Sequence, residues 1–411
     1  MEAFDVVIIG GDMVGLALAL GLNGCGMRIA IIEHVPQQHI CDLQKAQILK
    51  ISAINTASQA LLEYLGVWKT IIQKKVGCYQ CMEIWQKNSL SYIRFDATEH
   101  HLTALGHTID NAIICESLWQ QVKLSKDIAF LRKHKLKKIF WGEHEVFITV
   151  DNEQMLTARL IVSADGSKSW LREQADIPIS FWDYEHMELV AIIRSDTPHM
   201  QTAYQAFHSN GMLACFPLHD PHHYSIFWSL PTMQARRYLD LEVSNFEKEL
   251  SVALDMRLGF CQLISKRQIF HLIGQYAKNF ASQRIVLIGD SARTLHHLAG
   301  QEVNLGLMDV AELMGQIRYL NTEGKDIGQY FYLQSYERKR KYHTILVVAS
   351  IQRLKQLFYG EHPMKKIVGD IGLRLTNIVP GIKEKLLHYA LGSNDMPEWL
   401  VKITANSSEI I

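Results

Sequence analysis

The stretch that decides the fold is residues 4–33, which read FDVVIIGGDMVGLALALGLNGCGMRIAIIE. It opens with an apolar, β-branched run that is typical of a buried parallel strand. A glycine turn at residues 10–15 leads into an Ala- and Leu-rich helical run at 16–22, and residues 28–33 supply a second strand. This order predicts a βαβ unit that binds the ADP part of a cofactor. The helix N-terminus would face the pyrophosphate, and Glu33 would face the ribose hydroxyls.

The glycine turn departs from the dinucleotide pattern Gly-x-Gly-x-x-Gly at one position. Gly10 and Gly15 supply the outer glycines, but Asp12 replaces the middle one. That glycine normally lets the backbone approach the pyrophosphate, so a carboxylate opposes the ligand by shape and by charge. At ~5 Å and an effective dielectric of ~20, each extra negative pair costs about 3 kcal/mol. Taken alone, the stretch is also compatible with a parallel-sheet turn that binds nothing.

Composition indicates a soluble globular protein. A chain of 411 residues is too long for one ordinary core, so we expect two domains. Lys+Arg and Asp+Glu number 42 each, which gives no general electrostatic reason to bind nucleic acid. We see no signal peptide and no apolar stretch long enough for a transmembrane segment, so we expect a cytoplasmic protein.

The seven cysteines are scattered and odd in number, as expected in a reducing compartment. Cys78 and Cys81 form the one close pair, without a second pair or histidines at ligand spacing. Buried free thiols are therefore favoured over a zinc site. The nineteen histidines show no ligand spacing either, so we expect no metal site.

The order of elements predicts an α/β fold with an inserted antiparallel sheet. Strands like the first recur at residues 160–163 and 284–289, and four runs at hairpin spacing lie between them, from 188 to 230. Helices fill most of the chain after residue 303. We therefore expect a discontinuous Rossmann-like domain, an inserted substrate domain and a C-terminal helical segment. The expected boundaries are 1–75, 101–172 and 276–345 for the first, 76–100 and 173–275 for the second, and 346–411 for the third.

Two further motifs lie far from the first. Residues 165–172 read DGSKSWLR and match an Asp-Gly-x-x-Ser-x-x-Arg pattern, and residues 289–309 read GDSARTLHHLAGQEVNLGLMD. With the βαβ unit, they resemble the flavin-dependent aromatic hydroxylases that have the para-hydroxybenzoate hydroxylase fold. Within these, the chain is similar to the ubiquinone-biosynthesis branch that hydroxylates polyprenylated rings, and there to the 2-octaprenylphenol hydroxylase group. Shorter matching segments span the chain: 52–55, 65–68, 181–184, 336–338 and 397–400.

The resemblance implies a monooxygenase reaction. FAD would be the tightly bound cofactor and NAD(P)H a transient reductant. Oxygen would add at C4a of the reduced flavin, and the hydroperoxide would hydroxylate a polyprenylphenol. The resemblance assigns no catalytic side chain, although His297 and Gly300 would lie nearest the flavin ring. The cofactor-binding positions that it implies are Gly10, Gly15, Glu33, Lys50, Asp165, Gly166, Gly289, Asp290, Gly300, Gln301, Val303 and Asn304.

Some of these positions have implied roles. Asp290 would contact a ribityl or ribose hydroxyl, where a carboxylate accepts a strong hydrogen bond. The loop from Gly300 to Asn304 would direct backbone N–H groups and a helix dipole at the flavin N1/O2 edge, which favours the anionic reduced form. We interpret Phe216, Leu218 and Trp228 as a surface for the ring and prenyl tail, with plain sheet core as the alternative.

The departures from the family pattern are concentrated near the implied cofactor. They are Asp12 for glycine, Lys50 for arginine, Arg293 for histidine, His297 for proline and Glu302 for glycine. Glu302 is the gravest, because it adds negative charge beside the reduced flavin. It also strains the backbone if the glycine it replaces has positive φ.

Three readings follow from these departures. One is an active hydroxylase with compensated contacts, for example Arg293 neutralising Asp12. Another is an FAD-weakened or FAD-free homologue with an accessory role in a quinone-biosynthesis complex. The third is a flavoprotein oxidoreductase that acts on other substrates.

The implied partners are a polyprenylphenol and O2. A homo-oligomer, a place in a ubiquinone-biosynthesis complex and peripheral contact with the inner membrane are all compatible with the resemblance. The basic, partly apolar stretch 336–357 could face a membrane or a partner. We favour a helix packed on the FAD domain with a solvated basic end.

Overall fold

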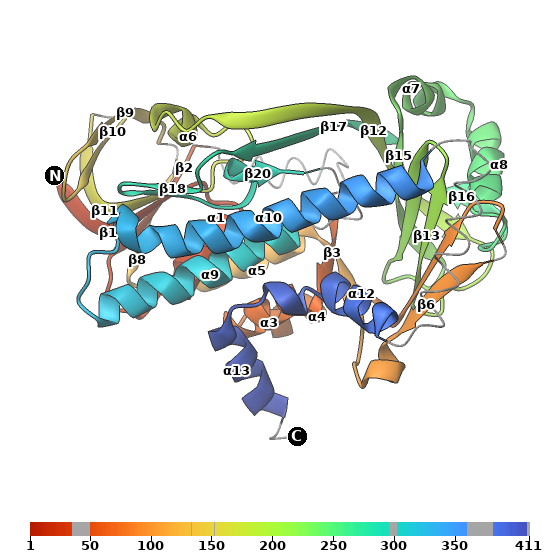
Figure 1. Cartoon of the computed structure of the whole chain (residues 1–411), viewed down its shortest axis with the longest axis horizontal. Coiled ribbons are helices and arrows are strands. Elements are labelled where there is room, and N and C mark those ends of the chain that lie inside the picture. The colour runs from red at the N-terminus through yellow and green to blue at the C-terminus, as the bar shows by residue number, and fades with distance from the viewer. Residues whose placement is uncertain are drawn as a thin grey trace.

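The computed structural model describes residues 1–34, 50–89, 91–132, 134–151, 153–295, 302–359 and 381–408. These residues form an eight-stranded, a nine-stranded and a three-stranded sheet. In Figure 1 the eight-stranded sheet and the nine-stranded sheet occupy opposite ends of the molecule. Cys41 lies outside the described residues, and the other six cysteines are free thiols. Of the close pair, Cys81 is buried as predicted, while Cys78 is only partly buried.

The eight-stranded sheet is built on β1 (Glu2–Ile9). β1 pairs in parallel with β2 (Ile29–Glu33) on one side and with β11 (Met155–Ser163) on the other. The order is β18-β19-β11-β1-β2-β8, with β10 and β9 added antiparallel beside β11. The strand expected near position 160 is thus β11, which lies beside β1, and the strand expected near position 285 is β19, which lies beside β11. The remaining bounds are β8 (Ile128–Arg132), β9 (Leu136–Trp141), β10 (Val146–Val150), β18 (Ala281–Ser282) and β19 (Ile285–Leu287).

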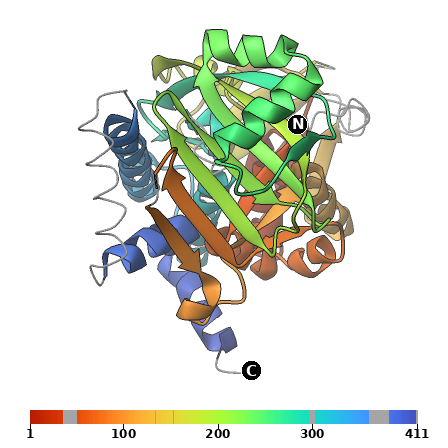
Figure 2. The same cartoon turned by 90° about the vertical axis from the view of Figure 1, so that its right-hand side faces the viewer.

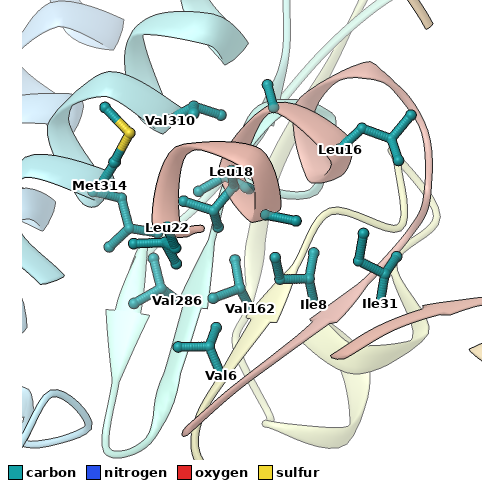
Figure 3. Packing of buried hydrophobic residues seen from close by; sticks show 14 of the residues in the cluster. Val6, Ile8, Leu16, Leu18, Leu22, Ile31, Val162, Val286, Val310 and Met314 are labelled. Carbon is teal, nitrogen blue, oxygen red and sulfur yellow. The ribbon is translucent and has the colours of Figure 1, made fainter. Parts of the chain in front are cut away.

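The core of this sheet lies under helix α1 (Met13–Leu22), which is buried on nearly all sides. Figure 3 shows Leu18 and Leu22 between strand residues such as Val162 and residues of α9 (Glu302–Thr322) such as Met314. Strand residues buried on both faces explain the uninterrupted apolar runs in the sequence. The other helices near this sheet are α3 (Thr56–Tyr64), α4 (Trp68–Ile72), α5 (Asn111–Leu124), α6 (Trp170–Gln174) and α10 (Tyr330–Phe358).

The nine-stranded sheet has the order β20-β17-β12-β15-β14-β13-β5-β6, with β16 beside β12. β12 (Ile179–Ser195) and β17 (Gln268–Ala277) form a long ribbon that reaches back toward the first sheet (Figure 1). The expected antiparallel sheet is confirmed with one exception, since β5 and β13 pair in parallel. The other bounds are β5 (Cys81–Gln86), β6 (Tyr92–Asp96), β13 (Thr202–His208), β14 (Gly211–Pro217), β15 (His223–Pro231), β16 (Cys261–Leu263) and β20 (Arg293–Thr294).

The two faces of this sheet bury different side chains. Phe216 and Phe227 lie on the inner face, in a cluster with residues of β3 (Ile51–Asn55). The outer face packs under α7 (Thr232–Asp240) and α8 (Val243–Ala253), which lie in front of the sheet in Figure 2.

The interpretation of Phe216 and Trp228 as one surface is therefore wrong. Trp228 belongs to the outer cluster and packs against Tyr238 and Phe246, with ring centroids 4.8 and 6.4 Å away. Successive residues of a strand point to opposite faces, so Phe227 and Trp228 separate.

The three-stranded sheet joins β3 to β7 (Gly106–Asp110) and β4 (Gly77–Tyr79). The chain ends in α12 (Ile382–Leu391) and α13 (Glu398–Ser408), which lie below the body of the molecule in Figure 1. Among the described helices, none combines the length and the apolar character needed to cross a bilayer.

Candidate functional site

Three strand ends meet at one edge of the eight-stranded sheet. Ile9 of β1 pairs with Ser163 of β11, and Ser163 pairs with Leu287 of β19. The segments that follow these strands carry the three sequence motifs. In open α/β sheets, ligands bind beyond the carboxyl ends of the strands, so this edge is the candidate site.

Gly10 and Gly15 are required by close backbone approaches at this edge. Gly10 has φ +109°, and a Cβ there would lie 2.2 Å from the carbonyl oxygen of Ala164. A Cβ at Gly15 would lie 2.0 Å from the carbonyl oxygen of Gly10. Neither position has room for a side chain, so the two glycines bring the start of α1 against β1 and β11.

Asp12 caps the helix that follows. Its φ of −88° suits any residue, and its carboxylate accepts a hydrogen bond from the Met13 N–H at 2.8 Å. The Cys115 thiol donates to the same oxygen at 2.9 Å, and burial together with Asp12 raises the pKa of that thiol. Asp12 therefore stabilises the N-terminus of α1 as its N-cap. Its negative charge lies at the position where a pyrophosphate would approach the helix.

Glu33 ends β2 beside the same turn. Its carboxylate accepts a hydrogen bond from the Gly11 N–H at 2.5 Å. The acid thus lies next to the glycine turn, as the βαβ pattern predicts.

The Asp165 motif ties two strand ends together. The Asp165 carboxylate accepts from the Ser163 hydroxyl at 2.6 Å, and Ser169 caps α6 by accepting from the Arg172 N–H at 2.9 Å. The buried Arg172 guanidinium donates to the carbonyl oxygen of Ser291 at 3.0 Å. Gly166 has φ +84° with open space around it. The motif therefore holds the loop after β11 against the loop after β19.

The third motif begins where β19 meets α1. Gly289 has φ +60°, and a Cβ there would lie 3.3 Å from Val14 of α1. The neighbouring Asp290 is exposed, while Asn304 is buried in the first turn of α9. Asn304 accepts from the Asn55 N–H at 3.1 Å and donates to the carbonyl oxygen of Ala53 at 2.8 Å. It thereby clamps β3 to the start of α9.

Arg293 does not face Asp12. Its Nη1 donates to both carboxylate oxygens of Asp309, at 3.0 and 2.8 Å, in a pair with side chains 2% and 0% exposed. Arg340 donates to Asp309 at 2.5 Å and also binds Asp395. The hypothesis that Arg293 neutralises Asp12 is therefore wrong.

The basic end of stretch 336–357 is only partly solvated, in contrast to the interpretation above. Arg340, one of its basic residues, is 1% exposed. Sequence periodicity could not predict the ion pairs of Arg340 with Asp309 and Asp395. Asp395 is far from Arg340 in the chain, and no periodic spacing marks a charged residue as buried.

Glu302 is the first residue of α9, so its backbone is right-handed helical and the strain expected from a positive φ does not arise. Burial, reinforced by the nearby Asp290 carboxylate, raises the pKa of Glu302 well above its usual value. A protonated carboxyl group carries no charge, which removes the expected repulsion of a reduced flavin while the proton is bound.

The described site residues thus converge only in part. The ends of β1, β2, β11 and β19, with the turns and the helix start that follow them, hold Gly10, Gly15, Glu33, Asp165, Gly166, Gly289 and Asp290. Val303 and Asn304 lie in the first turn of α9. Lys50 is exposed just before β3. His297, Gly300 and Gln301 lie outside the described residues. Sequence reasoning missed Cys115, which hydrogen-bonds to Asp12 although the two residues are 103 positions apart. No motif in the sequence pointed to it.

Known proteins agree with this architecture. The chain is 27% identical over 389 residues to 3-demethoxyubiquinol 3-hydroxylase of Escherichia coli, covering 94% of this chain and 98% of that protein. It is 28% identical over 436 residues to the mitochondrial ubiquinone biosynthesis monooxygenase COQ6 of Danio rerio, covering 95% and 90%.

Among solved structures, p-nitrophenol 4-monooxygenase PnpA of Pseudomonas putida superposes with a TM-score of 0.74 at 14% identity, covering 95% of this chain and 99% of that one. This likeness confirms the expected fold class. The family profile described as "FAD binding domain" matches residues 3–350. The chain therefore belongs to the family that shares this FAD binding domain.

Proposed function

We propose that the protein is an FAD-dependent monooxygenase that hydroxylates a prenylated phenol in ubiquinone biosynthesis, with O2 and NAD(P)H as co-substrates. The observation that carries the proposal is the meeting of three motif-bearing strand ends around Gly10 and Gly15. The relatives named as a hydroxylase and a monooxygenase of ubiquinone compounds support the substrate class.

The residues at this edge fit an ADP-type cofactor. Gly10 and Gly15 let the turn and the start of α1 pack closely against β11 and the end of β1, which brings the N-terminus of α1 to the sheet edge where a pyrophosphate would lie. Glu33 would take the ribose hydroxyls, and the exposed Asp290 a hydroxyl of the ribityl chain. Asp12 opposes this ligand by charge, because its carboxylate lies at the N-terminus of α1.

Bound FAD would supply the oxygen activation and electron transfer. The chain would hold it at the strand ends, with the first turn of α9 directed at the ring. The inner face of the nine-stranded sheet is apolar and includes Tyr79, Phe216 and Phe227. Such a face would exclude water from the reacting ring and accept a prenylated phenol. We assign no proton transfer to a side chain.

The finer features remain part of this proposal. They are the transient binding of NAD(P)H, homo-oligomerisation, membership of a ubiquinone-biosynthesis complex, peripheral contact with the inner membrane and the domain boundaries given above. The accessory role without FAD is not favoured, because the relatives carry the names of enzymes.

The first test is the visible absorption spectrum of the purified protein before and after addition of FAD. We expect a flavin spectrum and near-stoichiometric FAD after removal of excess cofactor. A folded, colourless protein that ignores added FAD would exclude the enzyme. In that case Asp12→Gly combined with Glu302→Gly tests whether those two residues are the cause.

The second test is turnover. The FAD-loaded protein should oxidise NAD(P)H faster when a prenylphenol is added, and mass spectrometry should find one added oxygen atom in the ring. A yellow protein that leaves prenylphenols unchanged would point to a flavoprotein oxidoreductase with another substrate.

A further inference from the structure

Two hydrogen bonds hold the carboxylate of Asp12, and both reach the same oxygen atom. Oδ1 accepts from the Met13 N–H at 2.8 Å and from the Cys115 thiol at 2.9 Å. The other oxygen, Oδ2, accepts no hydrogen bond from the residues that the structure describes. The two donors therefore fix the orientation of this carboxylate at the start of α1.

Cys115 reaches Asp12 from the neighbouring helix α5. The thiol is 7% exposed, and α1 and α5 pack together in the core beneath the glycine turn. Asp12, in contrast, is exposed. The hydrogen bond thus runs from a buried position on one helix to an exposed carboxylate at the N-terminus of the other, and it draws Oδ1 toward α5.

The thiol can donate only while it keeps its proton. Burial raises the pKa of Cys115 well above its usual value, and the carboxylates of Asp12 and Asp110 raise it further. Cys115 is therefore a neutral donor at physiological pH. It adds no negative charge of its own to the start of α1, where a thiolate would repel an anionic ligand.

The place of the Asp12 charge matters because a pyrophosphate would bind at this helix N-terminus. Without the thiol, the carboxylate keeps one anchor, the Met13 N–H, and gains freedom to turn toward the ligand. A move from ~6 Å to ~5 Å at an effective dielectric of ~20 lowers affinity about 2.5-fold for each charge of the pyrophosphate. A small displacement of Asp12 is thus enough to be measured.

We propose that Cys115 is a positioning residue for the cofactor. Its thiol holds the Asp12 carboxylate on the side of α5 and so reduces the repulsion between Asp12 and the pyrophosphate of FAD. Cys115 acts through Asp12 and does not itself contact the reacting atoms. The inference rests on the proposed function, because it concerns the binding of FAD.

The first test is the dissociation constant of FAD, measured by quenching of flavin fluorescence with the full chain. Cys115→Ala removes the donor, and we expect FAD to bind about threefold to fivefold more weakly. Cys115→Ser keeps a donor and should stay within about twofold of the wild type. Cys215→Ala removes another buried thiol, in the outer cluster of the nine-stranded sheet, and should leave the constant unchanged.

Asp12→Asn separates positioning of the charge from mere support of the helix. Asparagine keeps an oxygen that accepts from both Met13 and Cys115, but it carries no charge. If Cys115 acts through the charge of Asp12, adding Cys115→Ala to Asp12→Asn leaves FAD affinity unchanged. If the thiol only supports the start of α1, the loss of affinity persists in this double variant, and the proposal is wrong.

The second test needs no cofactor. The infrared S–H stretching band of Cys115 is isolated by subtracting the spectrum of the matching Cys115→Ser protein. A carboxylate accepts more strongly than an amide, so the band should lie at lower frequency in the wild type than in Asp12→Asn. The same frequency in both would show that the thiol does not donate to the Asp12 carboxylate in solution, which overturns the proposal.

The outcomes distinguish this inference from the proposed function. A wild type that binds FAD, with unchanged or higher affinity in Cys115→Ala, would overturn the role of Cys115 alone. A folded wild type that binds no FAD would overturn both. Thermal unfolding of each variant without FAD reports its loss of stability separately, so a folding defect in Cys115→Ala is recognised, and Cys115→Ser then carries the comparison with Asp12→Asn.

Discussion

Arg293 and Asp309 form a buried ion pair in which one guanidinium nitrogen contacts both carboxylate oxygens, at 3.0 and 2.8 Å. Asp309 also accepts from the Gly289 N–H at 2.9 Å. The pair therefore connects β20 and α9 to the turn where β19 ends. Arg293, which the family pattern places near the cofactor, therefore stabilises the packing of these elements through Asp309.

Removing one partner of this pair should be costly. Arg293→Met leaves the Asp309 charge with Arg340 as its remaining described cation, and we expect the free energy of unfolding to fall by about 3 kcal/mol. Urea denaturation measures the change. The matched control is Lys339→Met, which breaks an exposed ion pair with Glu312 and should cost less than about 1 kcal/mol. Equal effects of the two substitutions would contradict the role given to Arg293.

Asp12 should limit FAD affinity through its charge. Asp12→Asn keeps a side chain that can cap α1 but removes the carboxylate, so we expect FAD to bind about tenfold tighter or more. Quenching of flavin fluorescence during titration measures this. Asp12→Gly should behave similarly if charge dominates. Tighter binding in Asp12→Gly but not in Asp12→Asn would instead assign the effect to shape.

Glu302 should make stability depend on pH. Its pKa in the folded protein is raised, so the folded state keeps a proton that the unfolded chain releases. The contribution of Glu302 to the free energy of unfolding is present at low pH. It is lost as pH rises from the pKa of Glu302 in the unfolded chain through its pKa in the folded protein. Glu302→Gln removes this dependence, so the stability of the wild type relative to Glu302→Gln should fall as pH rises above about 4.5. Parallel stability curves, from urea denaturation at each pH, would show that Glu302 does not titrate this way.

Gly15 should tolerate no side chain. Gly15→Ala places a Cβ 2.0 Å from the carbonyl oxygen of Gly10, so α1 must move away from β1. We expect a loss of about 3 kcal/mol and of FAD binding. Gly24→Ala is the control, because Gly24 has φ +73° but open space around it, and should cost about 1 kcal/mol. Thermal unfolding and FAD titration compare the two variants, and retention of FAD by Gly15→Ala would disprove the tight approach.

The sequence by itself determined the βαβ unit, the recurrence of parallel strands and the largely antiparallel insert. These follow from local patterns, since β-branched apolar runs, glycine turns and hairpin spacing act over a few residues. The same patterns located the segments around Gly10, Asp165 and Gly289 that meet at the sheet edge.

Only the tertiary structure decided which side chains those segments use, and for what. Trp228 and Phe216 share a sheet but not a face, because register assigns each residue its side. The ion pair of Arg293 with Asp309 and the hydrogen bond of Cys115 to Asp12 join different elements, so no local sequence pattern predicts them. Burial likewise raises the pKa of Glu302, and burial is a property of the assembled fold and not of the residue.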